Sequence, residues 1–199
     1  MEQSAHHLDH ELDPVVEYNS SKLGMWLFLG TEVLLFGGLF AAYAIFRAKF
    51  PEMFIEQHKE LDITKGAINT IVLIFSSMTM AIAVWAAKRG DQKKVVLFMV
   101  ITIICGLVFG GIKYFEYGAK FSHHIYPSTN IFFALYFLMT GLHMIHVFAG
   151  IVILAVIAFL AHKGKFSKEY YTPVEVGGLY WHLVDLIWIY LFPLLYLIG

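Results

Sequence analysis

Apolar residues run through this chain in five long stretches, and the short segments between them hold most of the charged residues. Each stretch is long enough to cross the hydrocarbon core of a bilayer as a helix, which takes about 20 apolar residues. The sequence therefore predicts an all-α integral membrane protein built as a bundle of five transmembrane helices. We expect these helices at 23–47, 67–87, 94–118, 129–161 and 176–198.

The composition agrees with a chain that is surrounded by lipid. Of its 199 residues, 59% are hydrophobic and 15% are charged, whereas a soluble domain has about 25% charged residues. The five spans leave no room for a separate soluble domain, and we expect no nucleic-acid partner. We expect two parts, a cytoplasmic N-terminal tail at 1–21 and a five-helix transmembrane domain at 22–199.

The basic residues give an orientation. With a cytoplasmic N-terminus, the inside segments hold eight Lys and Arg residues and the outside segments hold six. The shortest loop, 88–94, is also the most basic, and short loops weigh most in the positive-inside rule. We expect the N-terminus inside and the C-terminus outside. The eight inside residues are Lys22, Lys88, Arg89, Lys93, Lys94, Lys163, Lys165 and Lys168.

Glu32 is the one ionisable residue in the apolar stretch 24–46. A charged group at that depth costs several kcal/mol, so it must be protonated, paired or hydrated, and it marks a functional position by default. On a helical wheel, Gly30, Gly37 and Ala41 form a small-residue ridge nearly opposite Glu32. We therefore expect Glu32 to face a second partner or a lipid-filled cleft. Two roles stay open, a protonated acid that bonds a neighbouring helix and a proton-linked group.

Two later spans hold the other buried polar candidates. His143 and His146 stand at i and i+3 in the fourth span, and His182 and Asp185 do so in the fifth, so each pair shares a helix face. Counting about 1.5 Å per residue, Glu32 and Asp185 fall at similar depths. The sequence therefore predicts a buried layer of acids and imidazoles, in which Asp185 is neutral or paired with a protonated histidine.

The layer could also be a metal or haem site, but the inventory argues against it. Three histidines on two helices could supply axial haem ligands or part of a zinc site. However, no CxxCH motif is present and a di-metal site needs more ligands, so we expect no metal and no catalytic residue here. Lys113 and Glu116, near the outer end of the third span, are expected to form an interfacial i, i+3 ion pair.

These motifs, taken in order, resemble subunit III of the haem–copper oxidases, the cytochrome c oxidase family. They are TEVLLFGG at 31–38, Asn69 with Thr70, YFEY at 114–117, LHMIHVFAG at 142–150 and YWHLVDLIW at 180–188. The resemblance covers about residues 22–199. Longer members have seven helices, and this chain resembles the short five-helix bacterial form.

The resemblance implies a non-catalytic membrane subunit of a respiratory terminal oxidase, in the bacterial cytoplasmic membrane. Haem and copper would be held by partner subunits, with subunit I in direct contact and structural phospholipid bound to this chain. The subunit would stabilise the catalytic subunit through turnover and support proton uptake. The family's carbodiimide-reactive membrane carboxylate falls on Glu32, which makes that residue the proton-linked candidate.

Several alternatives stay open on the sequence alone. Within the superfamily, the chain could be subunit III of a quinol oxidase or an accessory protein of nitric oxide reductase, because other subunits recognise the electron donor. Outside it, the chain could be a small proton-linked transporter that uses Glu32 and Asp185, or a membrane b-type cytochrome that uses its histidines. A transporter is expected to show inverted repeats or broken helices, and neither pattern is evident.

Overall fold

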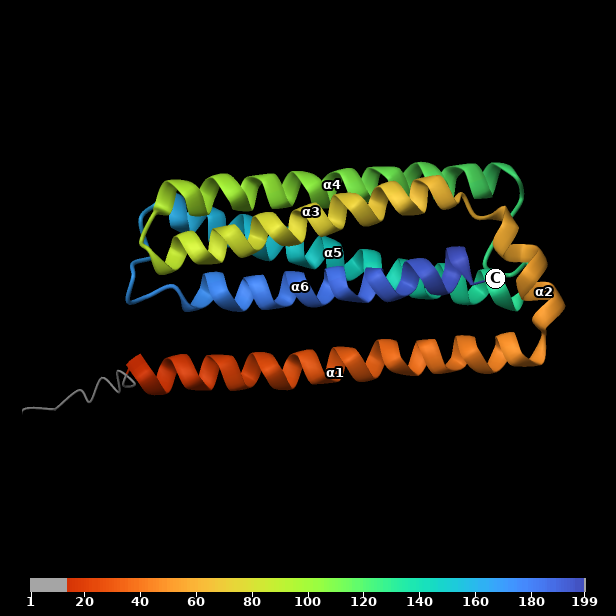
Figure 1. Cartoon of the computed structure of the whole chain (residues 1–199), viewed down its shortest axis with the longest axis horizontal. Coiled ribbons are helices and arrows are strands. Elements are labelled where there is room, and N and C mark those ends of the chain that lie inside the picture. The colour runs from red at the N-terminus through yellow and green to blue at the C-terminus, as the bar shows by residue number, and fades with distance from the viewer. Residues whose placement is uncertain (1–13, 199) are drawn as a thin grey trace, which may run out of the picture.

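The computed structural model describes residues 14–198, and helices account for nearly all of that range (Figure 1). Five of the helices within it are long and apolar enough to span a membrane, which confirms the predicted bundle. Two short helices follow the first of them, within the segment 48–66. The elements are α1 (Pro14–Lys49), α2 (Pro51–Gln57), η1 (His58–Glu60), α3 (Ile63–Lys88), α4 (Gln92–Ser122), α5 (Ile131–His162), α6 (Thr172–Phe192) and η2 (Pro193–Leu197).

The helix α1 begins about two turns earlier than the sequence analysis placed it. It includes positions 14–21, which the domain prediction assigned to a cytoplasmic tail; the first 13 residues of that tail lie outside the described residues. A proline suits the first turn of a helix, where its missing N–H would have no partner. The extra turns are held by Tyr18, whose hydroxyl donates to Glu175 at the start of α6.

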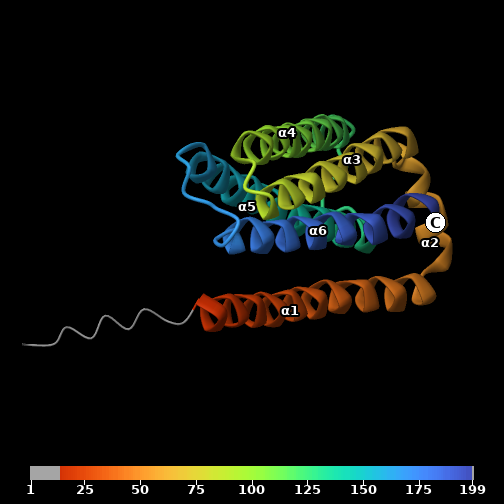
Figure 2. The same cartoon turned by 60° about the vertical axis from the view of Figure 1, so that its left-hand side comes forward.

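The helices α3 to α6 pack into one bundle, and α1 lies along it as a separate rod. Figures 1 and 2 both show α1 at the edge of the molecule, with α2 crossing the end of the bundle to reach α3. Within the chain, α1 packs mainly on α6 and less on α5, while α3 and α4 are the most closely packed pair. Much of the surface of α1 is therefore left exposed, including Leu23, Trp26, Leu27 and Leu34.

Trp181 fills the centre of the bundle by entering between two glycines. A Cβ at Gly106 of α4 would lie 2.8 Å from its indole ring, and one at Gly150 of α5 would lie 2.9 Å from it. The indole N–H donates to Ser76 Oγ of α3. One side chain of α6 thus fixes the positions of three other helices, and the two glycines are required by this close approach.

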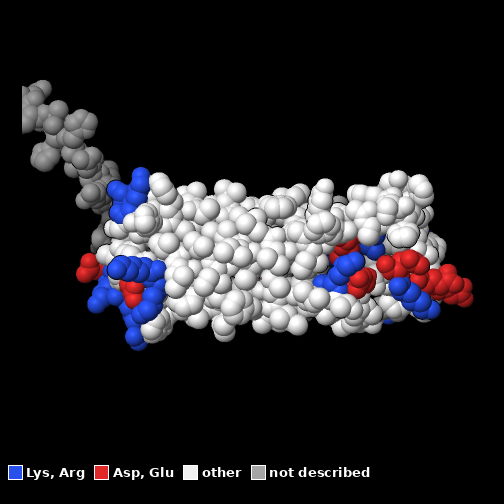
Figure 3. Space-filling view, turned by 90° about the horizontal axis from the view of Figure 1, so that it is seen from above, with Lys and Arg blue, Asp and Glu red and all other residues white. Residues whose placement is uncertain are grey.

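Charged residues gather at the two ends of the bundle and leave a wide uncharged band between them (Figure 3). We call the end with the turns at 89–91 and 163–171 the basic end, and the opposite end the α2 end. At the basic end Asp91 caps α4, and at the α2 end Asp62 caps α3. The backbone N–H of Lys65 donates to the Asp62 carboxylate and lowers its pKa. The uncharged band agrees with a membrane-spanning chain.

The last helix changes type at a proline. Pro193 has no backbone N–H to donate, and α6 ends at Phe192, after which residues 193–197 form a wider π-helical turn. The backbone N–H of Ile198 donates to the carbonyl of Pro193, five residues back. This turn directs Tyr196 into the bundle, where its side chain is 0% exposed.

Candidate functional site

Glu32 of α1 contacts His146 of α5. The Glu32 Oε2 atom lies 2.9 Å from His146 Nε2, and both side chains are mostly buried. The other ring nitrogen, Nδ1, lies 2.8 Å from the carbonyl oxygen of Leu142. A carbonyl oxygen only accepts, so Nδ1 carries a proton. A hydrogen bond across the 2.9 Å contact then requires one more proton, either on Glu32 or on His146 Nε2.

The surroundings of this pair are apolar. The ring of Phe36, one turn along α1, packs edge-on against the His146 imidazole with centroids 5.4 Å apart. The backbone carbonyl of His146 accepts a hydrogen bond from the hydroxyl of Tyr180, which is on α6. Glu32 therefore faces a second helix of its own chain, α5. The predicted ridge lies elsewhere, because a Cβ at Gly30 or at Gly37 would meet nothing.

Asp185 and His182 bind serines of α3 rather than each other or another histidine. Asp185 is 2% exposed and lies 3.4 Å from Ser76 Oγ, while His182 Nδ1 lies 2.8 Å from Ser77 Oγ. Of the two states predicted for Asp185, neutral or paired with a protonated histidine, the pairing is not found among the described residues. The two α6 residues point to adjacent serines, which the sequence offers as a polar pair within the apolar run of α3.

His143 lies deeper in the bundle than the other histidines. Its imidazole is 0% exposed and is held between two aromatic rings, edge-on to Phe109 and stacked on Trp188. In the part of the chain that the structure describes, neither of its nitrogens has a hydrogen-bond partner, and neither amide atom of the buried Asn69 has one. The structure therefore divides the predicted polar layer into separate groups, of which only Glu32 and His146 join two ionisable residues.

Lys113 and Glu116 form the predicted ion pair, but inside the bundle. Lys113 Nζ lies 2.9 Å from Glu116 Oε2, and the side chains are 1% and 3% exposed. The other carboxylate oxygen, Oε1, accepts hydrogen bonds from the hydroxyls of Tyr136 on α5 and Tyr196 in η2. Lys113 also donates to Tyr196 and lies over the Trp188 ring. We call Lys113, Glu116, Tyr136 and Tyr196 the charged network.

Sequence reasoning missed several of these partners. The residues Tyr136, Tyr196, Ser76 and Ser77 were not named as polar partners. The buried pair Thr79 and Thr102, whose hydroxyls lie 2.8 Å apart, also escaped notice. A usable signal exists, because hydroxyl side chains within apolar spans often bond across helices. The serine pair and the threonines could have been found in this way.

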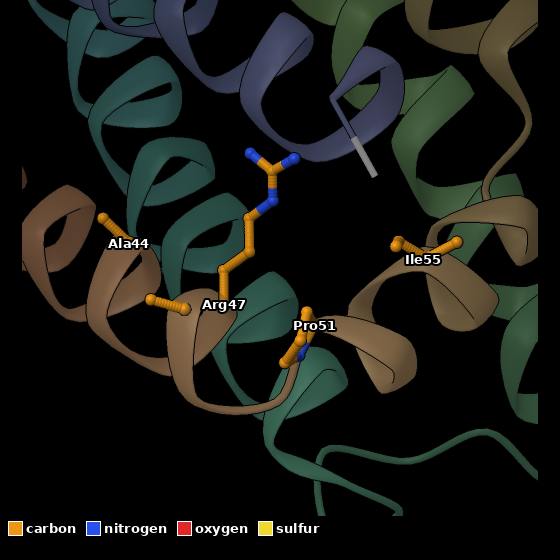
Figure 4. A pocket seen from close by; sticks show the side chains of 5 residues that line it. Ala44, Arg47, Pro51 and Ile55 are labelled. Carbon is orange, nitrogen blue, oxygen red and sulfur yellow. The ribbon is translucent and has the colours of Figure 1, made fainter.

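Two hollows follow one face of α1. An apolar cleft of about 330 Å³ lies between α1 and α6 and is lined mainly by Val33, Phe36, Phe40 and Leu186. Nearer the α2 end, a second hollow of about 350 Å³ is lined by Ala44, Arg47, Ala48, Pro51 and Ile55. Figure 4 shows the Arg47 side chain extending from α1 toward the C-terminal part of the chain.

The structure offers no ready-made metal centre in the range it describes. Among residues 14–198, no three His, Cys, Asp or Glu side chains come together as ligands. The lone Cys105 is half-buried and free. The site contains the Glu32–His146 pair, the contacts of Asp185 and His182 with two serines of α3, and the charged network. All of them lie within helices that span a membrane.

A bundle of this kind defines a multi-pass membrane protein. Comparisons with known proteins show its family. The family model described as cytochrome c oxidase subunit III matches residues 7–199. A cytochrome c oxidase subunit 3 of Thermostichus vulcanus is 38% identical over 177 residues, which is 88% of this chain and 86% of that protein. The chain belongs to the cytochrome c oxidase subunit III family, the third subunit of the haem–copper oxidases.

Other relatives are named as subunits of quinol oxidases, whose names give a quinol as the electron donor in place of cytochrome c. A probable quinol oxidase subunit 3 of Staphylococcus aureus is 30% identical over 181 residues, covering 90% of this chain and 89% of that protein. One of Staphylococcus epidermidis is 33% identical over 187 residues, with the same coverage. The family confirms the resemblance found in the sequence and places the chain in a multi-subunit oxidase.

Proposed function

We propose that this chain is a non-catalytic subunit of a bacterial cytochrome c oxidase, which it stabilises and whose proton uptake it supports. The complex passes electrons to oxygen and translocates protons, with haem and copper in partner subunits. The cytochrome c donor is favoured by the 38% identity to the Thermostichus protein, against 30–33% for the quinol oxidase relatives. A quinol oxidase is the second candidate.

The observation that carries this proposal is the Glu32–His146 pair. Within the described residues it joins an acid and an imidazole that both lie inside membrane-spanning helices, with Glu32 Oε2 2.9 Å from His146 Nε2. Intramembrane ionisable residues mark ion or proton pathways. The opposite side of α1 is exposed, and Gly30 and Gly37 leave room there for close approach of a helix from subunit I.

Co-purification tests the assembly. We expect the tagged chain, extracted in mild detergent, to bring down a haem-containing subunit, and the complex to oxidise reduced cytochrome c faster than a quinol. A complex that oxidises only quinol would select the second candidate. If the chain were recovered alone, folded and as heat-resistant as any complex, the subunit role would be wrong.

We also propose an orientation in the bacterial cytoplasmic membrane, with the basic end inside. Lys22 and Lys88 share the Glu175 carboxylate there, at 3.3 and 3.5 Å, and the surrounding turns add further basic residues. The N-terminus would then be cytoplasmic and the C-terminus outside. The positive-inside rule supports this arrangement.

A bound phospholipid is proposed for the face of α1 that carries the two hollows. The apolar cleft between α1 and α6 suits an acyl chain, and Arg47, two to three turns further along the same helix, suits a phosphate at the interface. Native mass spectrometry of the complex measures this. Arg47→Ala is expected to lower the amount of retained anionic lipid, and unchanged retention would contradict the assignment.

We predict that a hydrophobic carbodiimide labels Glu32 selectively at pH 7. The reagent partitions into lipid and reacts with a protonated acid, and Glu32 lies in an apolar setting beside exposed helix surface. Peptide mass spectrometry after treatment measures the labelling, and Glu32→Gln is the control that should assemble normally, because a neutral amide resembles the acid. Label confined to Glu52 and Glu56 of α2 would refute the prediction.

The partner residue sharpens this experiment. If the proton sits on Glu32, then His146→Phe leaves the acid without an acceptor and labelling persists. If the proton sits on the imidazole, the same substitution leaves a lone buried carboxylate, which takes up a proton because its charged form is costly in lipid. Labelling in His146→Phe well above wild type therefore assigns the wild-type proton to His146.

A further inference from the structure

Asn69 and His143 are buried without hydrogen-bond partners. Both side chains are 0% exposed, and all four of their polar atoms lack a partner among residues 14–198. A buried polar group that stays unpaired has lost its hydration without compensation, which destabilises the folded state. Such groups in folded proteins normally bind ordered water. Two of them, each with a donor and an acceptor, therefore need an explanation in this structure.

The two residues lie at the same level of the bundle. Trp188 links them, since its ring stacks on His143 and its N–H donates to Thr70, the residue after Asn69. The register of α3 and α4 agrees. These helices run antiparallel through a tight turn, and Thr79 faces Thr102. Asn69, ten residues before Thr79, therefore lies at the level of position 112. That position is about one turn from Phe109, whose ring packs on His143.

The charged network borders this level. Lys113 lies over the Trp188 ring with its ammonium 4.6 Å from the centroid, and the His143 imidazole stacks on that same ring. An ammonium beside the site disfavours a bound cation, and the nearby Glu116 carboxylate disfavours an anion. A neutral molecule that both donates and accepts satisfies the amide and the imidazole.

A polar hollow leads from the α2 end to the same network. It has a volume of about 210 Å³ and is lined in part by Glu60, Lys65, Glu116, Lys120 and His123. Glu116 borders this hollow on one side and bonds Lys113 on the other. Lys120, 5% exposed, uses one of its three donors on the Glu60 carbonyl. The hollow thus brings the solvent-facing surface to within one residue of Lys113.

We propose that Asn69 and His143 hold internal water, and that this water exchanges with the α2-end surface past Lys113 and Glu116. A buried water makes about three hydrogen bonds, which the amide, the imidazole and a second water provide. The site would hydrate the bundle from the α2 end to the level of His143, one helical turn from the Glu32–His146 pair.

Radiolytic labelling of the purified oxidase complex tests this proposal. A short X-ray pulse converts bound water to hydroxyl radical, which modifies adjacent side chains even when they are buried. After correction for intrinsic reactivity, we expect His143 and Trp188 to be modified about tenfold faster than Tyr43, which is equally buried but bonds a backbone carbonyl and packs on Phe54. Equal rates would overturn the proposal.

A matched pair of variants assigns the water to Asn69. Asn69→Leu keeps the branched shape of the side chain and removes the amide donor and acceptor. Labelling of His143 and Trp188 should therefore fall to the Tyr43 level. Leu73→Met, one turn along the same buried face of α3, should leave the labelling as in wild type. Labelling unchanged in Asn69→Leu would contradict the site. If that variant fails to assemble, the wild-type comparison with Tyr43 alone decides.

Discussion

Replacing Glu116 with alanine is expected to lower the free energy of unfolding by about 3–5 kcal/mol, since the substitution leaves the buried Lys113 ammonium without its counter-charge. The two tyrosine hydroxyls that donate to Glu116 Oε1 lose their acceptor as well. The loss should appear as a lower thermal midpoint of the purified complex and as less assembled subunit.

The control separates the charge from the hydrogen bonds. Lys113→Met combined with Glu116→Gln removes both charges, while the amide oxygen still accepts from the tyrosines. Replacing both members of a buried ion pair is often nearly neutral, so the double variant should be more stable than Glu116→Ala. A double variant that is equally unstable would show that shape, rather than charge, makes this network important.

Gly150→Val is expected to cost about 1–3 kcal/mol or more, because overpacking a well-filled core forces side chains and backbone to move. The new Cβ would lie 2.9 Å from the Trp181 ring and 3.1 Å from Tyr180. Trp181 has no room to move away, because the same six-membered ring also packs closely on Gly106 of α4. Thermal unfolding of the complex measures the effect.

Gly141→Val, nine residues earlier on α5, is the matched control. A Cβ there meets nothing within 4 Å, so only the small difference in helix propensity between glycine and valine remains. The two variants change the same residue type on the same helix. Equal destabilisation by both would show that helix propensity, and not the Trp181 contact, limits substitution at Gly150.

The number and order of the helices could be predicted because lipid imposes a simple pattern. A segment that crosses the hydrocarbon core must be apolar and must satisfy its own backbone, so length and hydropathy define each span. Glu32, His146 and Asp185 were recognised for the same reason, since ionisable residues are rare in such segments. The helix ends were less certain, as α1 shows: its first two turns are amphipathic and are held by Tyr18 and Glu175.

Partners could not be predicted from depth and helix face alone. Counting residues placed Glu32 and Asp185 in one layer, but it could not show that α1 packs against α6 and α5, which decides that Glu32 meets His146. The burial of Lys113 and Glu116 depends on Tyr196, and its direction is set by the π-helical turn after Pro193. Such a turn has no simple sequence signal beyond the proline.

The long sequence distance between α1 and its packing partners has a consequence for biogenesis. Tyr18 bonds a residue 157 positions later, and Tyr43 bonds the carbonyl of Leu194, 151 positions later. At a synthesis rate of about 5–20 residues per second, the ribosome needs roughly 8–30 s to reach those partners. His146 follows Glu32 by 114 positions, so a newly inserted α1 waits in the bilayer with Glu32 unpaired for roughly 6–23 s. Glu32 therefore meets its imidazole partner only when α5 is inserted, well after α1 has entered the bilayer.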